Sequence, residues 1–307
     1  MTDAKDKILM DKIIKLKKDK SIYIIAHYYQ RAEIQDIADF VGDSYAMAVA
    51  AQKSPHDTIL VAGVDFMAES AAILCPEKTV LSPEPGATCP MANRISVDDV
   101  QKFKEKYPDS IIVSYVNTPA DIKAVTDICC TSSNASKILE KLPEDARIYF
   151  IPDQNLAINV SNKMGRIVNF YDSSCPVHAA LKKADILKLK EQYPAAEVLV
   201  HPECNPEVVK LADYVGSTAG MINYTNISNS DSFIIATECG ITHPIQQANP
   251  DKKLIMASEE MICPNMKSIT LEKILYSLEN METIITVPEN IRIPAAQALE
   301  KMIAYSS

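Results

Sequence analysis

Short apolar segments alternate with amphipathic ones along most of the chain. The apolar segments are continuous and rich in β-branched residues, which is typical of strands buried on both faces of a parallel sheet. They cover residues 22–26, 58–62, 79–81, 110–115, 147–151, 166–170, 197–201, 233–236 and 253–256. The stretches between them, such as 97–107 and 184–193, predict helices, and each of these two ends at a Tyr-Pro pair.

Strand–helix–strand order predicts an α/β fold with parallel sheets and right-handed crossovers. The strands fall into three groups, and each group gains a short fourth strand, at 37–41, 124–128 or 211–215. We therefore expect three small α/β/α sandwich domains. Their predicted bounds are 1–88 together with the C-terminal helices of 268–307, then 89–174, then 175–267.

Reactive side chains repeat along the chain with a period of 86 to 88 residues. One register holds Cys89, Cys175 and Cys263; a second holds His27, Tyr115 and His201; Tyr29, Asn117 and Glu203 follow the second register by two positions; a third holds Ser44, Ser132 with Ser133, and Ser217 with Thr218. Each register lies where a predicted strand ends, and open parallel sheets bind ligands beyond the carboxyl ends of their strands. The repeat predicts three domains related by a pseudo-threefold axis around a central active site.

Composition excludes several classes of partner. The formal net charge is −9 and 47% of the residues are hydrophobic, so nucleic acid and anionic membranes are unsuitable partners. The N-terminus is polar and lysine-rich, and no apolar run reaches 18 residues. We expect a cytoplasmic protein whose eight cysteines do not form a disulfide framework.

Three thiols on separate domains can converge on a metal without any short Cys-x-x-Cys pair. Coincidence among buried strand ends is one interpretation, and a zinc site is another, although structural zinc prefers four protein ligands. An iron–sulfur cluster held by three thiolates fits as well, with one iron left open as a Lewis acid. Spacing alone leaves cluster and zinc open. Core packing is the interpretation for the cysteines off the register, which are Cys75, Cys129, Cys130, Cys204 and Cys239.

The hydroxyl register has a structural and a functional interpretation. Ser and Thr before a helix commonly cap it, but three such caps around one cavity would bind the phosphate or carboxylates of a ligand. The ring register favours catalysis, because Glu203 close to a histidine is a natural general acid–base. Three further carboxylates, Glu69, Asp153 and Glu238, either orient the groups that bind ligand or cap helices.

The combined motifs resemble the quinolinate synthase (NadA) family over nearly the whole chain. They are Ala26–Gln30 (AHYYQ), Gly63–Glu69 (GVDFMAE), Cys89–Ala92 (CPMA), Tyr115–Thr118 (YVNT), Cys130–Ala135 (CTSSNA), Cys175–His178 (CPVH), His201–Cys204 (HPEC), Val215–Thr218 (VGST), Ala236–Ile241 (ATECGI) and Cys263–Lys267 (CPNMK). Two positions depart from the usual pattern, because Ser173 and Ala157 stand where the family often has glycine.

The resemblance implies three α/β/α domains around one [4Fe–4S] cluster per chain, with Cys89, Cys175 and Cys263 as its ligands. It implies condensation of iminoaspartate with dihydroxyacetone phosphate to quinolinate, with release of phosphate and two waters, and coupling to an enzyme that produces iminoaspartate. Another open-iron hydro-lyase acting on a small hydroxy acid and a non-catalytic metal-binding protein are the alternatives.

Roles for the register residues follow from this reaction. Glu203 is expected to be the main acid–base, and His27 to serve triose isomerisation or proton transfer with Tyr29 closing the cavity. Tyr115 and Asn117 would orient the condensing intermediate, and His201 would bind an anion or hydroxyl. The substrate phosphate and carboxylates would be held by Ser44, Ser132, Ser217 and Thr218.

Overall fold

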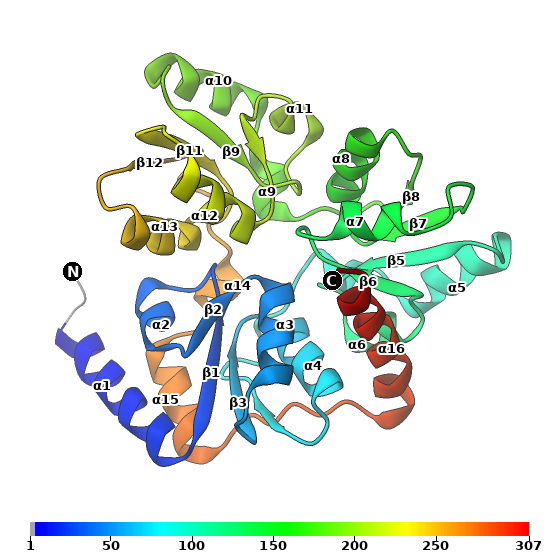
Figure 1. Ribbon diagram of the computed structural model, residues 1–307. Coiled ribbons are helices and arrows are strands. Elements are labelled where there is room, and N and C mark those ends of the chain that lie inside the picture. The colour runs from blue at the N-terminus through cyan, green and yellow to red at the C-terminus, as the bar shows by residue number, and fades with distance from the viewer. Residues whose placement is uncertain (1–3, 307) are drawn as a thin grey trace. The chain divides into compact units, whose positions relative to one another are not determined.

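The computed structural model describes residues 4–306 and confirms the α/β fold class, with three four-stranded parallel sheets (Figure 1). The strand orders are β2-β1-β3-β4, β6-β5-β7-β8 and β10-β9-β11-β12. In every sheet the first strand of the group lies between the second and the third. The three segments that repeat in sequence therefore share one topology.

The strands lie close to where the apolar pattern places them. The first sheet contains β1 (Ile22–His27), β2 (Phe40–Gly42), β3 (Thr58–Ala62) and β4 (Thr79–Leu81); the second contains β5 (Ile111–Tyr115), β6 (Ile128–Cys130), β7 (Ile148–Ile151) and β8 (Asn169–Phe170); the third contains β9 (Glu197–Val200), β10 (Tyr214–Val215), β11 (Ser232–Ala236) and β12 (Lys253–Met256). The second strand of each group begins about three residues later than predicted, because a short helix precedes it.

The helices begin and end at recognisable signals. They are α1 (Ala4–Asp19), α2 (Ala32–Ile37), α3 (Ser44–Lys53), α4 (Asp65–Leu74), η1 (Ala92–Arg94), α5 (Val97–Lys106), α6 (Ala120–Ala124), α7 (Ala135–Glu140), α8 (Gln154–Met164), α9 (Pro176–Ala180), α10 (Lys183–Gln192), α11 (Pro206–Val209), α12 (Thr218–Ile227), η2 (Cys239–Ile241), α13 (Thr242–Ala248), α14 (Pro264–Lys267), α15 (Leu271–Asn280) and α16 (Glu289–Ser306). At α5, for example, Ser96 and Asp99 form a reciprocal capping box, and Tyr107 ends the helix before a proline.

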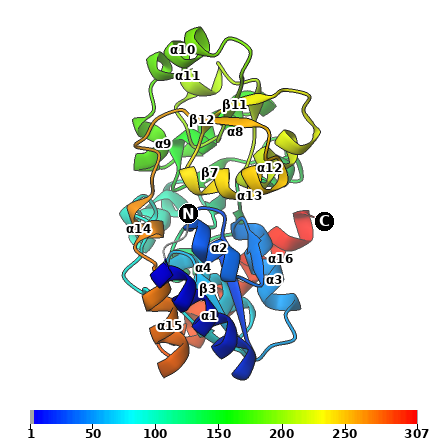
Figure 2. The same ribbon diagram turned by 90° about the vertical axis from the view of Figure 1, so that its left-hand side faces the viewer.

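The chain divides into two compact units. Unit 1 comprises Met1–Cys89, Val116–Cys129 and Pro264–Ala304, and unit 2 comprises Pro90–Tyr115, Cys130–Cys263 and Tyr305–Ser307. Within unit 1, α15 packs beside α1, as both views show (Figures 1 and 2). The ammonium of Lys20 donates to the carbonyl oxygens of Leu278 and Glu279 at 2.7 and 2.9 Å, which ties the end of α15 to the loop after α1.

The sheet topology decides where polar side chains gather. The chain leaves β1 toward one side, at β2, and then returns across β1 to β3 on the other side. Such a reversal opens a crevice beyond the carboxyl end of the first strand, where ligands bind in α/β proteins. His27 ends β1, Tyr115 ends β5 and His201 follows β9, so the ring register occupies this position in all three sheets.

The strands that carry these rings form the core of each unit. Ile24 and Ile25 of β1 are fully buried, as are Val198 and Leu199 of β9. Continuous burial explains why the apolar runs show no alternation. The grouping of the three sheets around one centre, and the three domain bounds, stay predictions of the sequence. Among the helices of the described residues, none is long and apolar enough to cross a membrane.

Candidate active site

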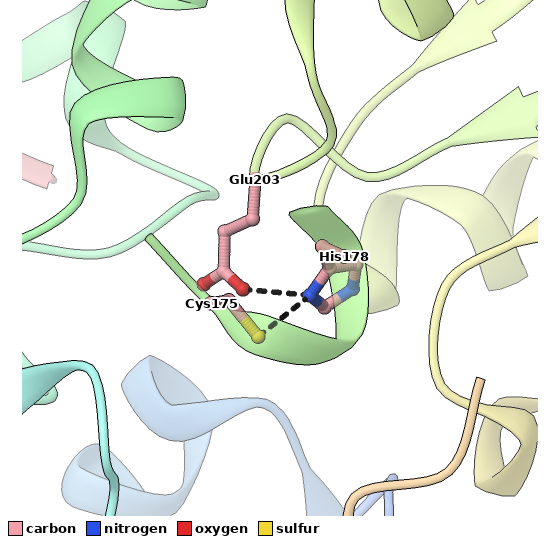
Figure 3. A group of neighbouring side chains, drawn as sticks. All are labelled: Cys175, His178 and Glu203. Carbon is pink, nitrogen blue, oxygen red and sulfur yellow. Dashed lines mark hydrogen bonds and ion pairs between the residues drawn. The ribbon is translucent and has the colours of Figure 1, made fainter. Parts of the chain in front are cut away.

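A thiol, an imidazole and a carboxylate meet inside unit 2 (Figure 3). His178 Nδ1 lies 3.1 Å from Cys175 Sγ and 2.9 Å from Glu203 Oε2. His178 Nε2 lies 2.9 Å from the hydroxyl oxygen of Thr237. His178 and Glu203 are buried, whereas Cys175 is half-buried. The sequence places Cys175 and Glu203 in different registers, and the fold brings them together.

His201, Ser132 and Tyr115 join this group of side chains. The His201 ring stacks on the His178 ring with centroids 4.8 Å apart, and His201 Nδ1 is 4.0 Å from Glu203 Oε2. His201 Nε2 lies 3.2 Å from the Ser132 hydroxyl. The side chain of Tyr115 hydrogen-bonds Glu203. Five of the predicted site residues, which come from four segments of the chain, therefore share one network.

Two asparagines of α8 fix the loop that carries His201 and Glu203. Asn155 Nδ2 donates to the carbonyl oxygen of Glu203 at 3.0 Å. Asn159 Nδ2 donates to the carbonyl oxygens of Pro202 and Cys204 at 2.8 and 2.9 Å. The loop after a strand has no ladder to satisfy its carbonyl groups, so side-chain amides take this role. Both asparagines are buried, so water does not compete for these hydrogen bonds.

The pKa values of Glu203 and His201 are both lowered in this network, for different reasons. Burial alone would raise the pKa of Glu203, but His178, His201 and Tyr115 together hold it well below its ordinary value. Burial lowers the pKa of His201 to about 3, so this ring is neutral near pH 7. Its Nδ1 accepts the Glu203 amide at 3.4 Å. The proton of the neutral ring is therefore on Nε2, which donates to Ser132.

Unit 1 repeats part of this arrangement around His27. The His27 ring is buried and its Nδ1 accepts the backbone N–H of Tyr29 at 3.1 Å, as His201 does from Glu203 two residues later. The Tyr29 ring lies edge-on to His27 with centroids 4.7 Å apart. Lys267 Nζ donates to the Tyr29 carbonyl oxygen at 2.6 Å. Asn117 lies half-buried in the loop after β5.

The hydroxyl register does not act uniformly in helix capping. Ser217 caps α12, since its oxygen accepts the Gly220 N–H at 3.2 Å, and Thr218 is the first residue of that helix. At α3 the cap is Asp43, which accepts the Ala46 N–H at 2.8 Å and leaves Ser44 as the first helical residue. Ser132 bonds to His201 instead of capping a helix. Capping therefore explains only Ser217.

The glycines that precede this register are required by aromatic packing. Neither Gly42 nor Gly216 has a positive φ. A Cβ at Gly42 would lie 2.6 Å from the Phe40 ring, and one at Gly216 would lie 2.6 Å from the Tyr214 ring. Each glycine thus lets the aromatic residue two positions earlier lie against the backbone.

The eight cysteines separate by environment. Cys75, Cys129, Cys130 and Cys204 are buried, whereas Cys89, Cys175, Cys239 and Cys263 are half-buried. Burial raises the pKa of Cys75 to about 11 and that of Cys129 to about 12. All four buried cysteines lie in the packed core, which is the interpretation that the sequence gives them. Cys239, which the sequence assigns to core packing, is an exception, because it is not fully buried.

The structure adds His178 and Asp65 to the residues that the sequence singles out, and Glu69 has one of its two expected roles, at the first N–H of α6. His178 lies in α9, three residues after Cys175, and it ends the Cys175–His178 motif of the family resemblance. Glu69 lies within α4 and accepts the Ala120 N–H at 3.0 Å. The carboxylate of unit 1 that follows its third strand, as Asp153 and Glu238 follow theirs, is instead Asp65.

The fold and these side chains define an α/β protein with a buried acid–base network beside a half-buried thiol. The family model described as "Quinolinate synthetase A protein" (NadA) matches residues 11–304. Similar relatives, each described as a quinolinate synthase, occur in Methanosarcina barkeri (47% identical; 96% of this chain and 97% of the relative), Dehalococcoides mccartyi (48%; 96% and 98%) and Thermodesulfovibrio yellowstonii (46%; 97% and 98%). The chain belongs to the quinolinate synthase family.

Proposed function

We propose that this protein condenses iminoaspartate with dihydroxyacetone phosphate to form quinolinate, phosphate and two waters, as a step of NAD biosynthesis in the cytoplasm. The observation that carries the proposal is the buried network of Cys175, His178, His201 and Glu203 in a chain of this family. The reaction needs several proton transfers and two anionic substrates. The network supplies titratable groups, and the hydroxyl register supplies donors for anions.

We further propose that Cys89, Cys175 and Cys263 bind one [4Fe–4S] cluster per chain. The donor set fits, because these thiols are half-buried while four of the other five are buried. Three thiolates suit an iron–sulfur cluster better than a structural zinc ion, which prefers four protein ligands. When bound, such a cluster supplies an open iron that polarises a hydroxyl or carboxylate oxygen.

The side chains around this site divide the work in the proposed reaction. Glu203 takes and returns protons, and its contact with His178 and Tyr115 fixes the direction in which its oxygens point. Neutral His201 presents Nε2–H as a donor toward Ser132 or a substrate oxygen. His27 serves isomerisation or proton transfer, and Tyr29 closes the cavity beside it.

Substrate binding and supply complete the proposal. Tyr115 and Asn117 orient the condensing intermediate, while Ser44, Ser132, Ser217 and Thr218 hold phosphate and carboxylates. Iminoaspartate is an unstable imine, so an enzyme that produces it must act close by. The net charge of −9 gives no reason to expect nucleic acid as a partner.

Anaerobic reconstitution with iron and sulfide, followed by assay with oxaloacetate, ammonia and dihydroxyacetone phosphate, tests the function. We expect a brown protein that forms quinolinate, detected directly by mass. A brown protein that instead dehydrates another small hydroxy acid would support the open-iron hydro-lyase. A protein that binds iron and catalyses neither reaction would contradict both enzymatic functions.

Removing both hydroxyls of the α12 N-terminus is expected to weaken substrate binding. Each hydrogen bond from a hydroxyl to a charged group contributes roughly 1.5–3 kcal/mol, so Ser217→Ala with Thr218→Ala should raise at least one KM by about tenfold or more. Ser96→Ala removes the cap of α5 and serves as the control for a lost helix cap. KM values for both substrates that match the Ser96→Ala values, with the cluster intact, would rule out this anion site.

A further inference from the structure

We propose that Asp65, Asp153 and Glu238 are positioning residues, each of which holds the backbone of one cluster cysteine. The inference rests on the proposed cluster and adds three residues to it. Asp65 acts on Cys89 within unit 1, while Asp153 acts on Cys175 and Glu238 acts on Cys263 within unit 2. The pairs lie 22 to 25 residues apart in sequence, a separation that repeats in all three segments.

The sheet topology makes the three pairs neighbours. Asp65, Asp153 and Glu238 follow the third strands β3, β7 and β11. The cysteines follow the fourth strands β4, β8 and β12, which pair in parallel with the third. The carboxyl ends of adjacent parallel strands meet at one edge, so each carboxylate turn lies beside its cysteine loop.

The same backbone hydrogen bond joins turn and loop in every case. The N–H of Asp65 donates to Ala87 O at 2.8 Å, that of Gln154 to Ser173 O at 2.8 Å, and that of Cys239 to Met261 O at 2.9 Å. Each acceptor stands two residues before a cluster cysteine. Three equivalent bonds at one position are a feature of the repeated fold, independent of the cysteine side chains.

The carboxylates act on the cysteine amides themselves. Glu238 Oε1 accepts the Cys263 N–H at 3.1 Å, while its Oε2 accepts the Gly240 N–H at 2.7 Å. Burial raises the pKa of Asp65 and Asp153, and the backbone N–H groups of Cys89 and Cys175 act on these carboxyl groups in the opposite, lowering sense. Asp153 also caps α8 through Oδ1, 3.0 Å from Leu156 N, whereas its Oδ2 has no partner at full hydrogen-bond geometry in the described chain.

Burial strengthens the hold of these carboxylates on the cysteine loops. Asp153 and Glu238 are fully buried. A buried carboxylate requires hydrogen-bond donors, so it orders the loop whose amide it binds. The backbone bond and the carboxylate together fix two points of the loop, at the cysteine and two residues before it. The backbone of the cysteine is thereby held in place before any iron arrives, which reduces the entropy lost on binding.

Iron retention in the holoenzyme tests the inference. Asp65→Asn, Asp153→Asn and Glu238→Gln keep the side-chain volume but replace one acceptor oxygen with a donor. Loss of a residue that orients metal ligands typically costs 10- to 100-fold in metal affinity, so we expect iron release to an anaerobic chelator to accelerate by roughly 10- to 100-fold. The electron paramagnetic resonance signal of the reduced cluster should also change shape.

Asp213→Asn is the matched control. The exposed Asp213 carboxylate also accepts a backbone N–H, that of Val198 at 2.8 Å, and Val198 is not a neighbour of any cysteine in sequence. We expect this variant to lose thermal stability without faster iron release. If the three variants release iron no faster than Asp213→Asn, their carboxylates only cap helices and the inference is wrong.

Two further outcomes distinguish a failure of this inference from a failure of the cluster proposal on which it rests. A wild-type protein that binds no iron–sulfur cluster overturns the cluster proposal and this inference together. If the amide variants do not fold, Glu238→Asp tests the inference in their place. This variant keeps the carboxylate but holds it one methylene further from Cys263. Faster iron release from Glu238→Asp than from Asp213→Asn supports the inference, and equal release overturns it.

Discussion

Cys89→Ser, Cys175→Ser and Cys263→Ser are each expected to lose the iron–sulfur chromophore and quinolinate formation. A serine hydroxyl does not ionise near neutral pH and cannot replace a thiolate ligand of a cluster. With only three protein ligands, the loss of one leaves the cluster held by two. Visible absorbance, iron content and the anaerobic assay measure the effect, and air should inactivate the wild-type protein because an open iron is exposed to oxidants.

The other cysteines provide the controls for this experiment. Cys129→Ser and Cys204→Ser should keep their iron, because both thiols are packed in the core and lie off the 86- to 88-residue register. Cys239→Ser is the sharper control, since Cys239 is half-buried like the three proposed ligands but lies off their register. Loss of iron in Cys204→Ser with retention in Cys175→Ser would show that the second ligand is assigned wrongly.

Much of the fold could be predicted because the two central strands of each sheet are almost fully buried. Continuous β-branched runs located β3, β4 and β12 to the residue. The short strands were less certain, since apolar runs of a few residues occur equally at the ends of helices. Ile34 and Ile37 are fully buried in α2, so the predicted strand at 37–41 begins at Phe40.

The site could be predicted only where residues repeat. The 86- to 88-residue spacing singled out His201 and Glu203, which the structure brings within 4.0 Å of each other. His178 has no counterpart in that spacing, and its position depends on one turn of α9 that points Nδ1 at Glu203. Asp65 and Glu69 are one helical turn apart, and sequence alone could not decide which of them reaches the cysteine loop.

Glu203 is the residue of the network best suited to move protons during the reaction. Its Oε2 lies 2.9 Å from His178 Nδ1, and Tyr115 hydrogen-bonds the same carboxylate. It is 5% exposed and its pKa is lowered by His178, His201 and Tyr115, so it is a base that is shielded from bulk water. Two dehydrations, a condensation and a phosphate loss each require a group that accepts and returns a proton at a fixed position.

Glu203→Gln is therefore expected to fold and bind the cluster normally but to form quinolinate about 10²- to 10⁴-fold more slowly. Glutamine keeps the shape and one acceptor oxygen, but it has no titrating proton. The expected signature is substrate consumption with little quinolinate, and an incompletely dehydrated condensation product that mass spectrometry detects.

Glu207→Gln, four residues further on and exposed, is the control and should be active. Near-normal turnover in Glu203→Gln would remove Glu203 from the mechanism and leave His27 as the better candidate, because His27 is the buried ring at the equivalent strand end of unit 1.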